Sequence, residues 1–338
     1  MDLNTVWFLL VAVLLTGYAI LDGFDLGVGV LHLFARSEEE RRLHLNAIGP
    51  VWDGNEVWLL TGGGALFAAF PVVYATVFSG FYLALVLVLL ALIFRAVSFE
   101  FRGKVDSPAW KAVWDWSFGL GSLVPAIVFG VAVGNILRGL SFDAQGNLAV
   151  SFFGLLNPYA LLIGVLSLAM FLMHGAAWLI LKTDGALQER LVQWASRLWL
   201  GYVAAFVLAS AATAFAAPWL VRQGGAPALQ WLCCALIVAA ATAFPLALHS
   251  RRFGRAFVAS SVAIAGQIGL CAAALFPRLV PSRPDLAQSL TVYNASSSPR
   301  TLTTMLVIAL VGMPLVIAYT VAIYRVFRGK TVLTATSY

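Results

Sequence analysis

Long apolar runs alternate with short charged or polar segments along almost the whole chain. Each run has about 20 residues, the length that an α-helix needs to cross roughly 30 Å of hydrocarbon. The charged residues between the runs set the boundaries and predict nine membrane-spanning helices. They cover residues 5–34, 53–70, 72–94, 113–137, 157–181, 199–221, 228–249, 256–276 and 302–324.

Two of these runs are less regular than the others. The second is short, begins with acids and carries the triplet Gly62–Gly64, which is as consistent with close helix packing as with a broken helix. The first run is interpreted as a membrane span, because Asp2 precedes it, no basic residue does, and it is too long for the apolar region of a signal peptide.

Composition agrees with a membrane protein. Hydrophobic residues make up 61% of the 338 residues and charged residues only 11%, against about 45–50% and about 25% in soluble proteins. A transmembrane barrel would need shorter, alternating segments. The predicted fold class is therefore an all-α polytopic membrane protein, and its three cysteines, all in apolar segments, are interpreted as packing residues.

The distribution of basic residues predicts the orientation. With nine spans, sixteen of the 21 Lys and Arg residues lie on the side of the C-terminus. The other side holds Arg138, Arg222, Arg278, Arg283 and Arg300. The positive-inside rule then places the N-terminus outside, in the periplasm, and the C-terminus in the cytoplasm. Omitting the second span would mix basic loops on both sides, and nucleic-acid binding is not needed to explain the net charge of +6.

The spans suggest one membrane domain over residues 1–338, because the longest connection, about 277–301, has the composition of an external loop. Residues 1–140 are expected to form a first four-helix bundle that holds a cluster of acids. Residues 198–330 are expected to form a second bundle, and the helix at 157–181 is expected to lie at the periphery.

Acidic residues inside the spans are the main candidates for chemistry. Asp22 and Asp25 are three residues apart and share a helix face, and Asp53 and Glu56 repeat this spacing at the start of the second span. A fifth acid outside the loops is Asp115. An acid in the bilayer costs roughly 2.5–3.5 kcal/mol, so such acids usually line a wet or proton-carrying path.

A structural explanation of these acids is also open. Asp22 or Asp25 could be held by one of three basic residues, Arg95, Arg102 or Lys104. Asp53 lies near the start of a helix, where an acid is favoured by the helix dipole and can act as the N-cap.

Histidine offers little support for a metal or haem site. Only His174 lies deep in a span, where a hydrogen-bonded packing role is the commoner explanation, and the others, His32, His44 and His249, are expected to face water at the cytoplasmic ends. No histidine pair has the spacing of metal ligands. The chain alone is therefore predicted to bind no metal or haem, and it lacks the GxxxxGK[ST] motif of a P-loop ATPase.

Five segments carry a resemblance to a known family. They are LDGFDLGVGVL at 21–31, GPVWDGNEVWLLTGGGALFAAFP at 49–71, FSGFYLALVL at 78–87, WDWSFGLGSLVP at 114–125 and NASSS at 294–298. The chain strongly resembles subunit II of the cytochrome bd-type quinol oxidases, including the cyanide-insensitive branch. The similarity is densest over 17–140 and weaker over 198–275.

The resemblance implies a nine-helix subunit that supports the assembly of a haem-bearing subunit I. Subunit I would carry two b-type haems, one d-type or further b-type haem, and the quinol site. The complex would oxidise quinol, reduce O2 to water and generate a membrane potential. A bound quinone, a small accessory subunit and the identity of the quinol are left open.

The resemblance also assigns candidate site residues. It implies a proton pathway from the cytoplasm through Asp53 of the WDGN motif, with Asp22 and Asp25 of the DGFD motif and Glu56 beside it. Trp58 matches a tryptophan near an oxygen route. Family members can carry His at the position of Val51, so a protonatable group is missing there.

Two other functions are compatible with acids in the membrane. A secondary transporter would use them to bind a coupling ion, with Gly62–Gly64 marking a broken helix. A purely structural assembly subunit would use them for packing. Copurification of haem and a second large subunit would favour the oxidase over the transporter.

Overall fold

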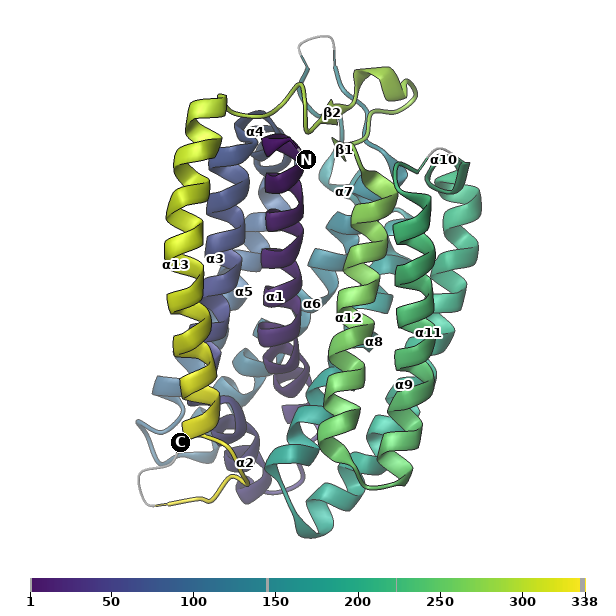
Figure 1. Cartoon of the computed structure of the whole chain (residues 1–338). Helices are drawn as coiled ribbons and strands as arrows, with labels where there is room; N and C mark the ends of the chain where they lie inside the picture. The colour runs from purple at the N-terminus through teal and green to yellow at the C-terminus, as the bar shows by residue number, and fades with distance from the viewer. Residues whose placement is uncertain (1, 144–145, 223, 335–337) are drawn as a thin grey trace.

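The computed structural model describes residues 2–143, 146–222, 224–334 and 338, which form a bundle of long helices with the two chain ends at opposite ends of the bundle (Figure 1). The helices are α1 Leu3–His32, α2 Glu38–Ile48, α3 Trp52–Ala69, α4 Pro71–Gly80, α5 Tyr82–Phe101, α6 Pro108–Arg138, α7 Phe152–Leu155, α8 Pro158–Lys182, α9 Gly185–Ala216, α10 Pro218–Arg222, α11 Pro227–His249, α12 Phe253–Leu275 and α13 Pro299–Val326. Strands β1 (Arg278–Val280) and β2 (Leu290–Thr291) pair antiparallel in the loop before α13.

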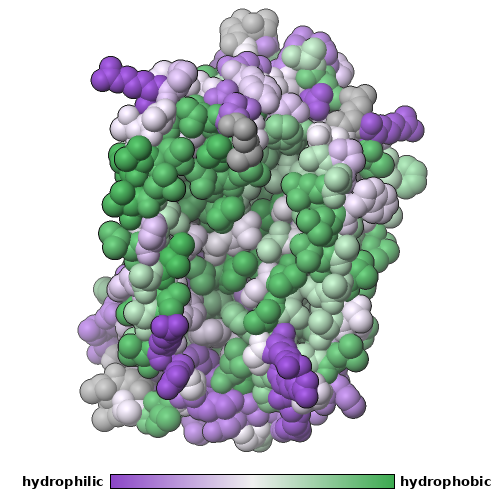
Figure 2. Space-filling view, in the orientation of Figure 1, coloured by the Kyte–Doolittle hydropathy of each residue, from purple (hydrophilic) through white to green (hydrophobic). Residues whose placement is uncertain are grey.

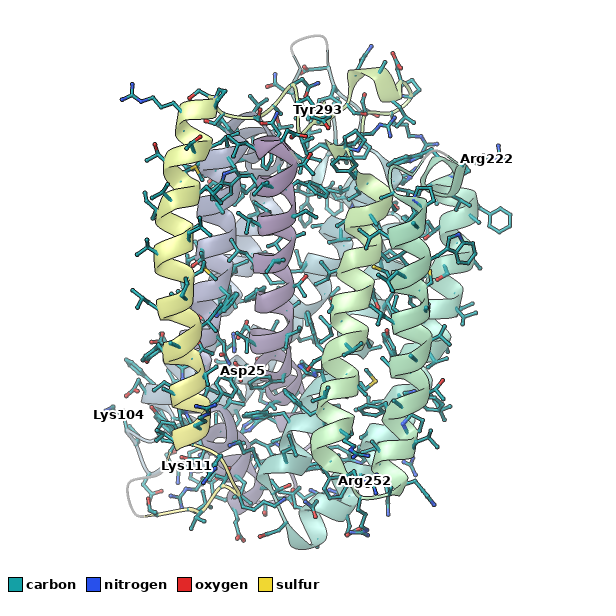
Figure 3. The ribbon with its side chains drawn as sticks, viewed as in Figure 1. Asp25, Lys104, Lys111, Arg222, Arg252 and Tyr293 are labelled. Atoms are coloured by element: carbon teal, nitrogen blue, oxygen red, sulfur yellow. The ribbon has the colours of Figure 1, made fainter. Side chains whose placement is uncertain are left out.

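Eight of the described helices are long and apolar enough to cross a membrane, and a ninth span results if α3 and α4 count as one bent pair. A broad apolar belt separates two polar ends of the molecule (Figure 2). The predicted all-helical membrane fold is thus confirmed. We call the end that carries Lys104, Lys111 and Arg252 the basic end (Figure 3). The opposite end, with Arg222 and Tyr293, is called the external end after the orientation that the positive-inside rule predicts.

The glycine triplet does not break the helix, and it allows close packing at Gly62 only, where an added Cβ would lie 3.2 Å from the Leu15 side chain of α1. Helix α3 continues through Gly62–Gly64, and a Cβ added at Gly63 or Gly64 would meet nothing within 4 Å. The break comes instead at Phe70, because Pro71 disfavours helical backbone in the residue before it. Helix α4 bends away by 120°. The predicted third span, 72–94, is therefore wrong in its boundaries, and α5 takes its place.

The long helices pack in two groups that meet where α1 and α6 both contact α8. Helix α1 contacts α3 and α6, and α6 contacts α5, whereas α8 contacts α9 and α12, and α11 contacts α12 and α9. In its most apolar stretch α8 is 67% buried and α13 is 0% buried. The prediction that the helix at 157–181 is peripheral is wrong, since α13 occupies the peripheral position beside α1 and α3 (Figure 1).

Glycines explain why α8 can occupy the centre. A Cβ added at Gly27 of α1 would lie 2.0 Å from the carbonyl oxygen of Phe171, and one at Gly175 would lie 2.6 Å from the carbonyl carbon of Gly27. The backbones of α1 and α8 are thus in direct contact, as small residues permit in membrane helices. This crossing and the contact of α6 with α8 join the two groups of helices.

Replacing Gly27 with Ala should lower the thermal stability of the purified chain. The new methyl group would meet backbone rather than a movable side chain, so the overpacking cost should reach about 1–3 kcal/mol. Thermal unfolding in detergent measures the effect. Gly63→Ala is the matched control because its Cβ meets nothing, and equal midpoints for the two variants would contradict a tight α1–α8 crossing.

Candidate functional site

A buried arginine joins two of the predicted acids. Arg95 donates from Nη2 to Asp22 Oδ1 at 2.6 Å and from Nη1 to Glu56 Oε1 at 2.7 Å. The side chains of Arg95 and Asp22 are wholly buried, and that of Glu56 is 25% exposed. Arg95 lies inside α5, although the predicted span 72–94 ended one residue before it. One cation thereby links α1, α3 and α5, and buried charges of this kind are stable only when paired.

Asp25, labelled in Figure 3, lies in α1 one helical turn beyond Asp22 but has different partners. Its Oδ2 accepts a hydrogen bond of 2.7 Å from Asn55 Nδ2, while its Oδ1 is buried and has no hydrogen-bond partner among the described residues. Tyr324 donates its hydroxyl to Asn55 Oδ1 at 2.9 Å. No ion pair of Asp25 occurs within the described part of the chain, so an amide, not a cation, faces this carboxylate.

Asp53 and Trp58 lie on different sides of α3. Asp53, in the first turn, is exposed on the surface of the chain. The N-cap role that was left open for Asp53 is wrong, because Val51 occupies that position. Trp58 packs against α1, since a Cβ added at Gly17 would lie 2.4 Å from the Trp58 ring. The structure therefore brings Asp22, Asp25 and Glu56 together around Arg95 and Asn55, and leaves Asp53 at the outer face.

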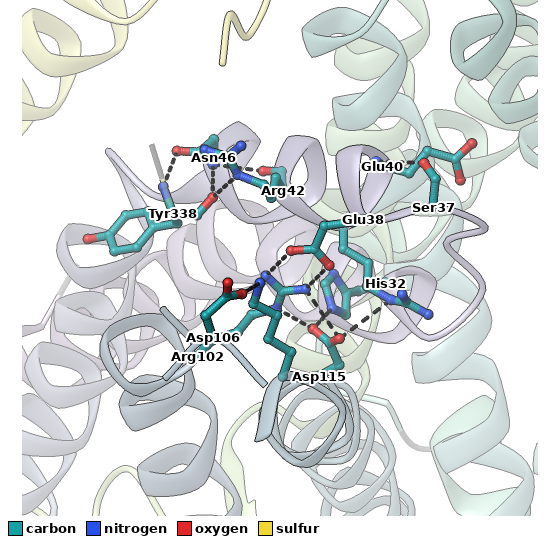
Figure 4. A network of polar contacts seen from close by, with 12 residues as sticks. His32, Ser37, Glu38, Glu40, Arg42, Asn46, Arg102, Asp106, Asp115 and Tyr338 are labelled. Atoms are coloured by element: carbon teal, nitrogen blue, oxygen red, sulfur yellow. Dashed lines mark hydrogen bonds and ion pairs between the residues drawn. The ribbon is translucent and has the colours of Figure 1, made fainter. Parts of the chain in front are cut away.

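A second charged network lies at the basic end (Figure 4). Asp115 accepts from Arg102 Nε at 2.5 Å and contacts His32 Nε2 at 2.7 Å, and Arg41 approaches it at 3.4 Å. Arg102 also donates two hydrogen bonds to Glu38. A cavity of about 460 Å³ opens beside these residues. The only sequence signal for this network was the acid Asp115 inside a span.

The histidines differ partly from expectation. His174 bonds through its two ring nitrogens to Ser260 and to the Ile20 carbonyl, which is a packing role. His32 and His44 are buried, so the prediction that they face water is wrong. Burial, helped by the nearby charges of His32 and Arg190, lowers the pKa of His44 to about 3. Within the described residues, no three His, Cys, Asp or Glu side chains converge as a metal site.

Fold and site together define a multi-pass membrane protein that keeps several acids, two of them paired with Arg95, within its helical core. The chain belongs to the cytochrome bd terminal oxidase subunit II family, whose model matches residues 3–327. This membership confirms the resemblance seen in the sequence motifs.

Similar proteins span nearly the whole chain. The "Cytochrome bd-I ubiquinol oxidase subunit 2" of Escherichia coli (strain K12) is 41% identical over 97% of this chain and 95% of its own length. The "Cytochrome bd ubiquinol oxidase subunit 2" of Bacillus subtilis (strain 168) is 42% identical, covering 97% of each chain. A chain in the structure of the bd oxidase from Geobacillus thermodenitrificans has the same fold, with a TM-score of 0.79 at 19% identity over 97% of this chain and 99% of that one.

Removing the charge of Arg95 should destabilise the protein strongly. Arg95→Gln leaves Asp22 and Glu56 without their cation, and breaking a buried pair in this way costs roughly 3–5 kcal/mol. The double variant Arg95→Gln, Asp22→Asn should recover part of the loss. Thermal unfolding of the two single variants and the double variant gives the coupling free energy between Arg95 and Asp22. Strictly additive effects would show that the pair does not interact in the folded protein.

The exposed ion pair of Lys111 with Asp106 provides the control for these measurements on Arg95 and Asp22. Asp106 has a side chain that is 98% exposed, and exposed pairs contribute little to stability. Lys111→Gln should therefore leave the unfolding temperature unchanged.

His44 should make the protein less stable in mild acid. Because its pKa falls from 6.5 to about 3 on folding, the unfolded chain binds a proton below pH 6.5 that the folded chain does not bind. Stability should fall by up to about 1.4 kcal/mol for each pH unit below that point. His44→Phe should reduce the slope of the unfolding temperature against pH, whereas the exposed His249→Gln should keep it. Equal slopes in all three proteins would contradict a neutral, buried His44.

Proposed function

We propose that this chain is subunit II of a bd-type ubiquinol oxidase and that it conducts protons from the cytoplasm toward the site of O2 reduction. The names of the relatives from Escherichia coli and Bacillus subtilis support the complex and its substrate class. The excess of basic residues at one end supports the direction, because it marks the cytoplasmic face.

The burial and the neutral partner of Asp25 are the observation that best supports the proton role. It is wholly buried in α1, its partner is the neutral amide of Asn55, and its Oδ1 has no hydrogen-bond partner in the described structure. Acids within a membrane that no cation neutralises mark proton or ion paths. Asp22, which Arg95 neutralises, fits a counter-ion better than a carrier.

The proposed route begins at Asp53 and enters the bundle through Glu56. Asp53 is exposed at the end of α3 nearest the basic end, and Glu56 lies one turn further along the same helix face. Glu56 contacts Arg95, and the neighbouring Asn55 contacts Asp25. The acids thus lead from the surface over one turn of α3 to Glu56, beside which Asn55 contacts the buried carboxylate of Asp25 on α1.

The outer face of α3 is the proposed contact with subunit I. Asp53, Val57, Leu60 and Phe67 are exposed along one stripe of this helix. Subunit I would cover this stripe and carry the two b-type haems, the d-type or further b-type haem, and the quinol site. His174 does not fit an axial haem ligand, because protein groups occupy its two nitrogens. Trp58 is proposed to border an oxygen route between α1 and α3.

This arrangement would separate charge without a pump. Protons consumed in forming water would come from the cytoplasm through this chain, while quinol oxidation would release its protons at the external face. The role of the chain is then to hold and pass protons and to keep subunit I assembled, and the redox chemistry belongs to the partner.

Asp53→Asn and Asp25→Asn should each lower O2-reduction turnover by at least about tenfold, because neither amide can take up and release a proton. Haem content and copurification of subunit I should persist. Oxygen consumption per haem, measured on the purified complex, tests the expectation, with the exposed Asp106→Asn as a control of equal chemistry.

Each outcome of this experiment separates the candidate functions. Unchanged turnover in an assembled variant would remove that acid from the path. Loss of haem or of subunit I would instead assign the acid a structural role. A haem-free chain that carries out transport by itself would replace the oxidase with a secondary transporter.

A further inference from the structure

A second cavity, of about 290 Å³, opens at the external end, near α7 and β1 in Figure 1. Arg138, the last residue of α6, and Arg283, in the loop after β1, line it together with Ser141, Val150 and Gly154. The sequence places only five basic residues on the external side. Two of these five face a single cavity.

No acid balances this pair of arginines. The cavity lining contains no Asp or Glu, and neither guanidinium forms an ion pair or hydrogen bond with the described residues. The acids nearest in sequence are engaged in their own loops: Asp143 accepts from the Asn147 N–H at 2.8 Å and Asp285 from the Ala287 N–H at 2.9 Å. Two like charges at one cavity repel each other, and a bound anion would relieve that repulsion.

The backbone fixes the two arginines relative to each other. Leu140 donates its N–H to the Pro281 carbonyl at 2.9 Å, and Arg283 donates its N–H to the Leu140 carbonyl at 2.8 Å. Gly139 has a φ of +87°, and a Cβ at this position would lie 3.5 Å from the Cβ of Arg283. The main-chain positions of the two arginines are therefore fixed, and a ligand that bridges them has only the two side chains to order.

An apolar surface adjoins the charged cavity. Phe153 of α7 is 80% exposed, and its neighbour Gly154 lines the cavity. The segment immediately precedes the start of α8, a candidate membrane span. Aromatic residues at such a position are typical of the membrane interface. The ligand therefore needs an anionic head and an apolar part.

We propose that this cavity binds the phosphoryl group of an anionic phospholipid from the external leaflet. Arg138 and Arg283 would donate to the phosphate oxygens, since the planar guanidinium matches phosphate geometry. The Ser141 hydroxyl would donate a further hydrogen bond, and Phe153 would contact an acyl chain. The site is independent of the proposed proton path at the opposite end.

Titration of the purified full chain in detergent tests this site. The probes are dihexanoylphosphatidylglycerol and inorganic phosphate, followed by native mass spectrometry. The double variant Arg138→Gln, Arg283→Gln should bind the lipid at least about tenfold more weakly than the wild type, because two charge-assisted contacts are lost. Arg222→Gln, an exposed arginine at the same end but outside the cavity, should bind as the wild type does.

Phe153→Ser distinguishes the two sources of phosphate. It should weaken binding of the lipid and leave binding of inorganic phosphate unchanged. If inorganic phosphate binds the wild type as tightly as the lipid does, the lipid assignment is overturned in favour of a soluble phosphate. Equal lipid affinity in the wild type and the double variant would overturn the site itself. Should the double variant fail to assemble, Arg283→Gln alone provides the same comparison, since this side chain is exposed.

Discussion

The ion pairs of Arg95 hold helices α1, α3 and α5 together in one arrangement. A guanidinium inside a helical core is tolerated only with matched acids around it, and here the acids come from α1 and α3 while the arginine comes from α5. Helix α6 packs directly against α5 at Arg95, because a Cβ added at Gly121 of α6 would lie 2.6 Å from the Ala91 carbonyl oxygen and 2.9 Å from the Arg95 Cβ. Arg95 is thus fixed by backbone on one side and by charge on the other.

The same interaction divides the acids by role. Asp22 and Asp25 have equal chemistry and neighbouring positions, yet one faces a cation and the other an amide. Arg95 pairs with both Asp22 and Glu56, and no cation among the described residues forms an ion pair with Asp25. The difference between a structural acid and a candidate proton carrier therefore arises from where one guanidinium points, which sequence spacing does not reveal.

The sequence was sufficient for the features that depend on local pattern. Apolar run length predicted the helical membrane fold, and the three-residue spacing identified acids that the fold brings together around Arg95. Features that depend on tertiary packing were missed. His32 and Asp115 are in contact although 83 positions separate them, and His44 is buried because α2 packs against α1 and α8. The central position of α8 required direct contact between Gly27 and Gly175, which hydropathy does not encode.

The two ends of the molecule use their basic residues differently. At the basic end, acids pair with several arginines: Arg102 with Asp115 and Glu38, and Arg190 with Glu40. These arginines count toward the positive-inside bias, but they form ion pairs that join α2, α5, α6 and α9. At the external end arginines are fewer, and the two at the cavity beside α7 have no acid partner in the described structure. At this cavity, therefore, an anionic ligand would meet two guanidinium groups whose charge no acid among the described residues offsets.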